Sequence, residues 1–271
     1  MKFSVLMSVY YKENPSYLQQ AIDSVINQTV RPDEIVLVKD GKLTEELEEV
    51  INKYLQSYNK LFTIIEFQEN KGLGVALAEG VKKSRNELIA RMDTDDICKP
   101  NRFEKQLEVF EQNPNLDIVG SYIQEFEGSI NNIVSIRKVP LRDIEIKKFG
   151  KMRNPFNHMT VMYKRSSVLK AGNYKEFLWN EDYYLWVRMI LDKCNMKNIN
   201  ESLVYARVDN GMYERRGGIR YAQIDCKLQR EYYNIGFVSK REFIINSLVR
   251  SSVRIIPNKL RKLIYKNKLR E

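Results

Sequence analysis

The chain has 271 residues, of which 43% are hydrophobic and 30% charged, a balance typical of a globular protein that can bury a sizeable core. No stretch reaches about 18 uninterrupted apolar residues, so we expect no membrane-spanning helix. Three cysteines, Cys98, Cys194 and Cys226, lie far apart without CxxC or Cys/His spacing. This spacing argues against a disulfide framework and a zinc site, and it favours a cytoplasmic protein.

The formal net charge of +10 is concentrated near the C-terminus. From Arg241 to Glu271, nine lysines and arginines face only two glutamates. A basic excess can serve nucleic acid, an anionic membrane surface or an anionic substrate. We therefore predict a main domain over 1–220 and a basic helical extension over 221–271.

The first hundred residues alternate between strand and helix patterns. Runs rich in Val and Ile predict strands, and segments with apolar residues at helical spacing lie between them. The expected strands are 3–9, 34–40, 61–69 and 87–93, and the expected helices are 14–29, 44–58 and 74–84. This alternation predicts an α/β fold with a doubly wound, mostly parallel sheet and flanking helices, in which 1–100 is one half of the domain.

The second half of the domain, 101–220, has a more varied pattern. We expect a helix at 102–114, a strand at 116–127, a strand leading into a short helix within 158–174, and an amphipathic helix at 181–194. Beyond Tyr205 the sequence is irregular and basic until helical segments resume at Tyr221.

Candidate site residues follow three of the expected strands. Ligands of such sheets bind beyond the carboxyl ends of the strands. Tyr10 follows the first strand, Asp40 the second, and the run "RMDTDD", with Asp93, Asp95 and Asp96, the fourth. Polar residues at strand ends are common, so each alone is weak, but together they indicate a binding edge.

Asp93 and Asp95 are two residues apart, so their side chains project to the same face of an extended strand end. Carboxylate oxygens select Mg²⁺ or Mn²⁺. Three neighbouring carboxylates repel one another unless a cation or strong donors compensate. The alternative is a solvated turn, in which Arg91 ion-pairs with the cluster.

Seven segments, taken in order, resemble the bacterial family 2 glycosyltransferases with the GT-A fold, over about residues 3–220. They are "SVLMSVYYKENPSYLQQAIDSVINQT", "EIVLVKDG", "NKGLGVALAEG", "ARMDTDD", "RFEKQ", "NHMTVMYKRSSVLKAGNY" and "EDYYLWVRM". Members of that family typically move a sugar, with inversion, from a nucleoside diphosphate to an acceptor hydroxyl. This subset resembles enzymes of capsule, O-antigen and exopolysaccharide assembly. The resemblance implies a nucleoside diphosphate sugar donor, foremost a UDP-sugar, and a glycan or lipid-linked glycan acceptor.

The resemblance also assigns donor-binding residues. It puts Tyr10 and Glu13 at the base and ribose and Asp40 near the uracil, with Lys71 and Arg91 as further donor contacts. The family often has two acids before the glycine, whereas this chain has "KDG" at 39–41. Which acid grips the nucleoside is therefore open. Arg215 and Arg216 suit a loop that closes on a diphosphate, because guanidinium groups match phosphate oxygens, although an exposed basic loop fits them equally.

For the metal, Mn²⁺ or Mg²⁺, the resemblance implies Asp95 as ligand, Asp93 at metal or ribose, and contact by His158, the single histidine. A lone histidine is more often a satisfied structural residue. Asp182, with Glu181 as its neighbour, matches the family's general base. The alternative is that both acids merely favour the N-terminus of their helix.

Two other functions stay open at this point. A sugar nucleotidyltransferase also places carboxylates and Mg²⁺ beside an α/β nucleotide site, but it would need a Gly-rich phosphate loop with a lysine near the N-terminus. A basic nucleic-acid-binding protein fits the net charge, yet the best motif is acidic and the positive charge lies in the C-terminal segment, so we expect no nucleic-acid partner.

The C-terminal segment has an amphipathic pattern. Leu248, Val249, Ser252 and Ile256 share one helical face, and Leu260, Leu263 and Ile264 do so after Pro257. A basic amphipathic helix can lie on an anionic membrane, which predicts peripheral attachment to the inner face of the cytoplasmic membrane. The alternative is that these helices pack on the main domain or form a partner interface.

Overall fold

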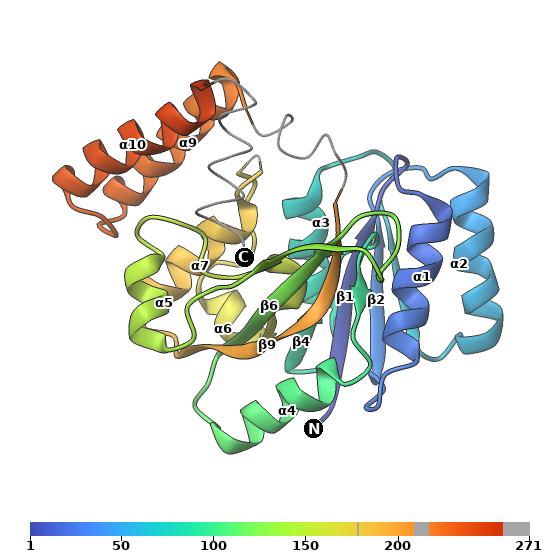
Figure 1. Ribbon diagram of the computed structural model, residues 1–271. Helices are drawn as coiled ribbons and strands as arrows, with labels where there is room; N and C mark the ends of the chain where they lie inside the picture. Colours follow the sequence, from blue (N-terminus) through green and yellow to red (C-terminus); the bar gives the residue numbers. More distant parts are fainter. Residues whose placement is uncertain (178, 209–216, 257–271) are drawn as a thin grey trace.

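The computed structural model describes residues 1–177, 179–208 and 217–256. Its strands form one sheet in the order β3-β2-β1-β4-β8-β6-β9-β5, with β7 paired to β6, and helices cover both faces (Figure 1). The strands are β1 (Phe3–Val9), β2 (Glu34–Lys39), β3 (Phe62–Glu66), β4 (Leu88–Arg91), β5 (Ile97–Cys98), β6 (Ile118–Phe126), β7 (Ile133–Arg137), β8 (Met162–Lys164) and β9 (Met196–Arg207).

The helices occupy the segments between and after these strands. They are α1 (Pro15–Ile26), α2 (Glu45–Tyr58), α3 (Leu73–Lys83), α4 (Arg102–Gln112), α5 (Asp143–Phe149), the 3-10 turn η1 (His158–Thr160), α6 (Arg165–Lys170), α7 (Glu181–Leu191), α9 (Ile219–Asn234) and α10 (Lys240–Ile255). Among the helices described, none is long and apolar enough to cross a membrane.

The predicted α/β fold is confirmed. β3, β2, β1 and β4 are all parallel, as the alternating pattern of the first hundred residues predicts. The sheet becomes mixed beyond β4, because β8 runs antiparallel to both β4 and β6. β9 then pairs in parallel with β6, so the second half of the domain departs from a simple doubly wound order.

Side chains of β1 alternate between two hydrophobic layers, as expected for a central strand buried on both faces. Val5, Met7 and Val9 pack in the layer that contains α1, α2 and α4. Leu6 packs on the opposite face, in the layer that contains α3, α5, α6 and α7. This sandwich fixes the carboxyl ends of β1, β2 and β4 at one edge, where the site residues lie.

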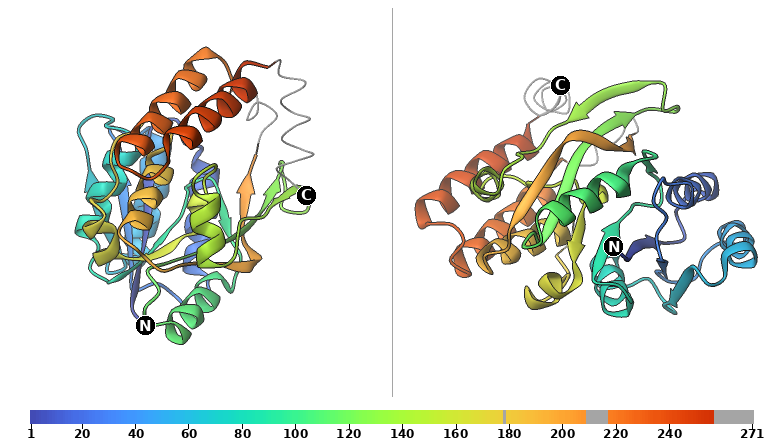
Figure 2. Two further views of the ribbon diagram at one scale, coloured as in Figure 1. Left: turned by 90° about the vertical axis from the view of Figure 1, so that its left-hand side faces the viewer. Right: turned by 90° about the horizontal axis from the view of Figure 1, so that it is seen from below.

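The helical extension begins at α9 and packs on α7. Tyr183 and Val187 of α7 share a buried cluster with Leu228 and Tyr232 of α9. Asp225 of α9 forms ion pairs with Arg250 at 2.5 Å and with Arg254 at 2.8 Å, which join α9 to α10. Seen from below in Figure 2, the pair of helices lies on the side of the molecule opposite α1 and α2.

Candidate active site

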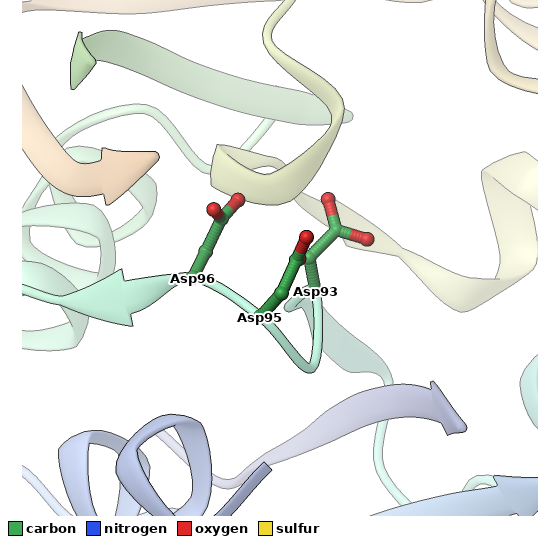
Figure 3. A group of neighbouring side chains, drawn as sticks. All are labelled: Asp93, Asp95 and Asp96. Carbon is green, nitrogen blue, oxygen red and sulfur yellow. The ribbon is translucent and has the colours of Figure 1, made fainter. Parts of the chain in front are cut away.

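The three aspartates of "RMDTDD" lie together in the turn between β4 and β5. One carboxylate oxygen from each of Asp93, Asp95 and Asp96 lies within 4.8 Å of the others. Figure 3 shows the three side chains rising on the same side of the turn. The turn therefore presents a set of oxygen ligands of the kind that Mg²⁺ and Mn²⁺ prefer.

The electrostatics of this turn fit a cation. Burial, with the charges of Asp93 and Glu13, raises the pKa of Asp95 to about 7. Burial and the charges of Asp95 and Asp93 raise the pKa of Asp96 well above its ordinary value. Carboxyl groups that resist ionisation in this way lack enough nearby positive charge, and a divalent cation would supply it.

Arg91, the last residue of β4, is the cation that the protein itself provides. Its side chain is buried and ion-pairs with Asp93. Burial alone would lower its pKa, but the Asp93 carboxylate outweighs that effect and raises it. Nε and Nη1 of Arg91 are buried without a hydrogen-bond partner. Such donors are costly to leave unpaired, so they mark a place where a bound anion would be stabilised.

Glu13 and Arg207, which lie outside the aspartate run, hold the turn in shape. Thr94 donates its hydroxyl to Glu13 Oε2 at 2.5 Å, which brings Glu13 beside the cluster. The backbone N–H of Arg207 donates to Asp96 Oδ1 at 2.7 Å, and its Nε donates to the carbonyl of Asp95 at 3.0 Å. The turn is thus braced from β1's loop on one side and from the end of β9 on the other.

Asp40 organises the loop that precedes α3. Its Oδ1 accepts from the backbone N–H of Lys71 at 2.7 Å, and its Oδ2 accepts from that of Gly72 at 3.0 Å. Gly41 beside it has φ +90°, and a Cβ there would lie 2.7 Å from the amide nitrogen of Asn70. Asp40 therefore shapes the loop that carries Lys71. Its direct contact with a uracil stays a prediction.

Tyr10 lies just beyond β1 and is 42% exposed. Its edge-to-face partner is Tyr11, at 5.8 Å between centroids. An exposed aromatic ring at this edge of the sheet is suited to stack on a nucleobase. Arg215 and Arg216, expected at the diphosphate, lie outside the described residues.

The second acidic pair begins α7. Asp182 Oδ2 accepts a hydrogen bond from Asn154 Nδ2 at 2.6 Å. Burial raises the pKa of Asp182, and it raises that of Glu181 to about 7 with help from the Asp182 charge. The positive charge of Arg91 opposes the increase at both residues. Glu181 and Asp182 are therefore both within electrostatic reach of the Arg91 guanidinium, which itself ion-pairs with Asp93.

His158 lies apart from the aspartate cluster. Among the described residues, the only histidine, cysteine or acidic groups placed to share a metal are the three aspartates. The His158 Nε2 lies 3.0 Å from the Tyr174 hydroxyl, and burial lowers the pKa of the imidazole well below its usual value. This geometry suits a structural histidine beside Trp186, and a metal contact by His158 stays a prediction.

Sequence reasoning did not anticipate the residues that position the acids. Thr94 lies inside the aspartate run that the sequence singles out, whereas Asn154 lies three residues before the segment that begins at Asn157. Arg207 carries no signal of its own, because only the β9 pairing brings it to the turn. Trp186 of α7 is fully buried in the hydrophobic core.

Comparisons with known proteins agree with this geometry. Residues 4–174 match the model of the family "Glycosyl transferase family 2". An uncharacterized glycosyltransferase of Haemophilus influenzae is 43% identical, over 100% of both chains. The Escherichia coli UDP-Gal:alpha-D-GlcNAc-diphosphoundecaprenol beta-1,3-galactosyltransferase is 40% identical, over 99% of this chain and 97% of its own. The amylovoran biosynthesis glycosyltransferase AmsE of Erwinia amylovora is 35% identical, over 97% of both.

Solved structures share the fold at lower identity. S. aureus TarS 1-349 in complex with UDP-GlcNAc has a TM-score of 0.69 at 18% identity, over 99% of this chain and 77% of that one. The mannosyltransferase PcManGT of Pyrobaculum calidifontis, in complex with GDP-Man and Mn²⁺, has a TM-score of 0.66 at 14% identity, over 92% and 69%. The fold is therefore GT-A, and the chain is a glycosyltransferase that belongs to family 2.

Proposed function

We propose that the chain transfers a hexosyl or N-acetylhexosaminyl group, with inversion, from a nucleoside diphosphate sugar to a hydroxyl of a lipid-linked glycan in surface polysaccharide synthesis. The observation that carries this proposal is that Arg91, which ion-pairs with Asp93 of the aspartate cluster, is also within electrostatic reach of the Glu181–Asp182 pair. One group suits a diphosphate with its cation, and the other suits an acceptor hydroxyl.

The donor would bind over the aspartate turn, with its diphosphate toward Arg91. Asp93 and Asp95 would hold Mn²⁺ or Mg²⁺, with Asp96 beside them. Such an ion, when bound, polarises the phosphate oxygens and offsets charge on the departing diphosphate. The unpartnered Nε and Nη1 of Arg91 would donate hydrogen bonds to the diphosphate from a positively charged group, as the cation does by its charge. In support, PcManGT was solved with GDP-Man and Mn²⁺.

Asp182 would take the proton from the attacking hydroxyl. Its raised pKa brings it nearer the range in which a carboxylate can accept a proton at neutral pH, and Asn154 fixes its position. One base and a direct attack from the face opposite the leaving diphosphate invert the configuration at the anomeric carbon. The pKa of Glu181 is also raised, and the charge of Asp182 contributes to that increase.

The acceptor class rests on the E. coli relative, which by its name acts on alpha-D-GlcNAc-diphosphoundecaprenol. We propose the same class here, a sugar joined through a diphosphate to a lipid. For the donor we propose the class of nucleoside diphosphate sugars, because TarS was solved with UDP-GlcNAc and PcManGT with GDP-Man on this fold.

For localisation, we propose a cytoplasmic protein that attaches to the inner face of the cytoplasmic membrane through α10. The outer face of α10 is apolar and exposed: Ile244, Ile245, Leu248, Val249 and Ile255. Its arginines 250 and 254 instead point inward to Asp225. Packing on the domain and attachment to a membrane are thus compatible, because one face of α10 contacts α9 and the apolar face is exposed. Leu260, Leu263 and Ile264 lie outside the described residues.

The proposed activity can be tested with purified full-length protein, Mn²⁺ and a panel of UDP- and GDP-sugars. The acceptor probe is GlcNAc linked through an α-diphosphate to an undecyl chain. We expect release of the nucleoside diphosphate together with a disaccharide product, both abolished by a chelator. Pyrophosphate release from a nucleoside triphosphate and a sugar phosphate, without disaccharide, would instead favour a nucleotidyltransferase.

A further inference from the structure

An exposed tryptophan lies three residues before Asp182. Trp179 is 44% exposed, and its φ of +63° is in the left-handed region that a bulky side chain seldom adopts. Such a conformation costs free energy and persists only where the surrounding structure holds it, often at functional sites. The placement of this indole is therefore enforced by its neighbours.

The enforcing contact comes from the helical extension. Trp179 stacks on Tyr221 of α9 with 3.9 Å between ring centroids and an interplanar angle of 17°. The Arg220 guanidinium lies 5.6 Å from the indole centroid, and that of Arg254 lies 5.2 Å from the Tyr221 centroid. Tyr221 covers one face of the indole, and the exposed part of the indole with the Arg220 guanidinium forms an aromatic, basic surface. We name it the Trp179 platform (Trp179, Tyr221 and Arg220).

The chain's other tryptophan shows by contrast what a packing role looks like. Trp186 is fully buried, with the rings of Phe156 and Tyr163 at 5.6 and 6.3 Å. Trp179 leaves nearly half of its surface to solvent instead. It is two residues from Glu181, so the two Cα atoms are at most about 7.6 Å apart. A sugar that lies on the indole would reach the acidic pair.

The chemistry of the platform identifies what it would bind. The C–H faces of a pyranose ring are apolar and pack on aromatic rings, while guanidinium groups pair with phosphate oxygens. A ligand site of this kind combines aromatic walls with a few placed polar groups. A glycosyl diphosphate offers both parts in one molecule, with the sugar next to the diphosphate.

We propose that the Trp179 platform is the acceptor subsite, which takes the acceptor sugar on the indole and its diphosphate at Arg220. This inference rests on the proposed function and specifies how its acceptor is recognised. It also gives α9 a role: the extension carries half of the subsite from Tyr221 and Arg220 to the base at the start of α7.

Steady-state kinetics with the undecyl-linked GlcNAc diphosphate test the proposal. Trp179→Ala should raise the KM for this acceptor by about tenfold or more, while the KM for the donor changes far less. Trp179→Phe should recover most of the loss, because it keeps an aromatic face. Arg220→Gln should raise the acceptor KM about tenfold, but less for a GlcNAc glycoside without the diphosphate.

Two exposed residues of α9 serve as matched controls. Tyr233→Ala removes an aromatic ring of similar exposure, 43%, and Arg230→Gln removes a guanidinium from the same helix. Neither should change the acceptor KM. If Trp179→Ala lowers thermal stability and alters donor and acceptor kinetics together, the stack of Trp179 on Tyr221 only stabilises the packing of α9, and the proposal is overturned.

Fluorescence gives a readout that needs no turnover. The chain has two tryptophans, and because Trp186 is buried, quenching by acrylamide reports mainly on Trp179. The acceptor probe should protect the wild-type protein from quenching, whereas the donor alone should not. Protection that is absent in a protein that still transfers sugar to the probe contradicts the platform. If neither binding nor transfer occurs with any donor, the acceptor class of the proposed function has failed instead.

Discussion

Asn154 donates a hydrogen bond from Nδ2 to Oδ2 of Asp182 at 2.6 Å, across the gap between a loop and the start of α7. The same asparagine accepts the backbone N–H of Phe156 on its Oδ1, so its amide orientation is fixed at both ends. Asp182 is thereby held in one direction while burial raises its pKa. A carboxylate that is oriented, half-buried and one turn from an open aromatic surface has the properties of a general base.

Replacement of this carboxylate should remove catalysis and keep donor binding. We expect Asp182→Asn to lower kcat by at least about 10²-fold, because the amide cannot accept the hydroxyl proton. The affinity for the nucleoside diphosphate sugar, measured by calorimetry, should stay nearly unchanged. A collapse of donor affinity would make Asp182 a binding or structural residue.

The hydrogen bond itself should tune the base. Because the Asn154 amide stabilises the ionised form of Asp182, its loss raises the pKa of that carboxyl further. In Asn154→Ala the acidic limb of the kcat profile should therefore move to higher pH, with the plateau at alkaline pH largely recovered. A profile that drops evenly at all pH values would show that Asn154 acts on the fold and not on the base.

The aspartate turn should bind a divalent cation through Asp95. In wild-type protein, Mn²⁺ should raise the midpoint of thermal unfolding, since a ligand that binds only the folded state stabilises it. Asp95→Asn should abolish this shift and divalent-dependent turnover, yet leave the metal-free protein at least as stable, because one of three repelling charges is gone. Glu111→Gln, an exposed carboxylate on α4, is the control. An unchanged Mn²⁺ response in Asp95→Asn would remove the metal assignment.

Elements of the first hundred residues could be predicted from local pattern. The apolar run of β1 and the spacing of Leu18, Ile22 and Val25 in α1 directly reflect burial against the same core. β9 could not be predicted, because half of its 12 residues are polar and its pairing positions in β6 lie about eighty residues earlier in the chain. Strands that form through such distant pairing leave little trace in a short window.

The site likewise has residues that the sequence predicts and spatial relations that it does not. Asp93, Asp95 and Asp182 stand in motifs that can be read in sequence order. Their joint relation to Arg91 depends on the approach of α7 to the β4 edge, which no local spacing encodes. Trp179 was overlooked for the converse reason: a left-handed tryptophan looks like any aromatic residue until its backbone is seen.

Glu181 should make stability fall as pH rises. Its folded-state pKa of about 7 exceeds the ordinary value of 4.5, so between these values the folded protein binds more protons than the unfolded chain. The free energy of unfolding then decreases with pH through that window, by at most about 3 kcal/mol. Glu181→Gln removes this contribution, so the variant should gain stability relative to wild type at pH 8 compared with pH 4.5. Urea unfolding at the two pH values, without divalent ions, measures the difference, and equal differences at both would contradict the raised pKa.

The outer face of α10 should govern membrane binding. Leu248 is 64% exposed on this face, and burial of a leucine side chain in an apolar environment is worth about 1.5–3 kcal/mol. Leu248→Asp in the full chain should therefore lower partitioning onto anionic vesicles by about tenfold or more, measured by co-sedimentation at low salt. Ile144→Asp is the matched control, because Ile144 is even more exposed, at 75%, and belongs to α5 and not to α10. Donor hydrolysis should be equal in both variants. Equal pelleting of both variants and the wild type, or no pelleting of the wild type, would show that α10 is not the attachment surface and that its exposed residues await a protein partner instead.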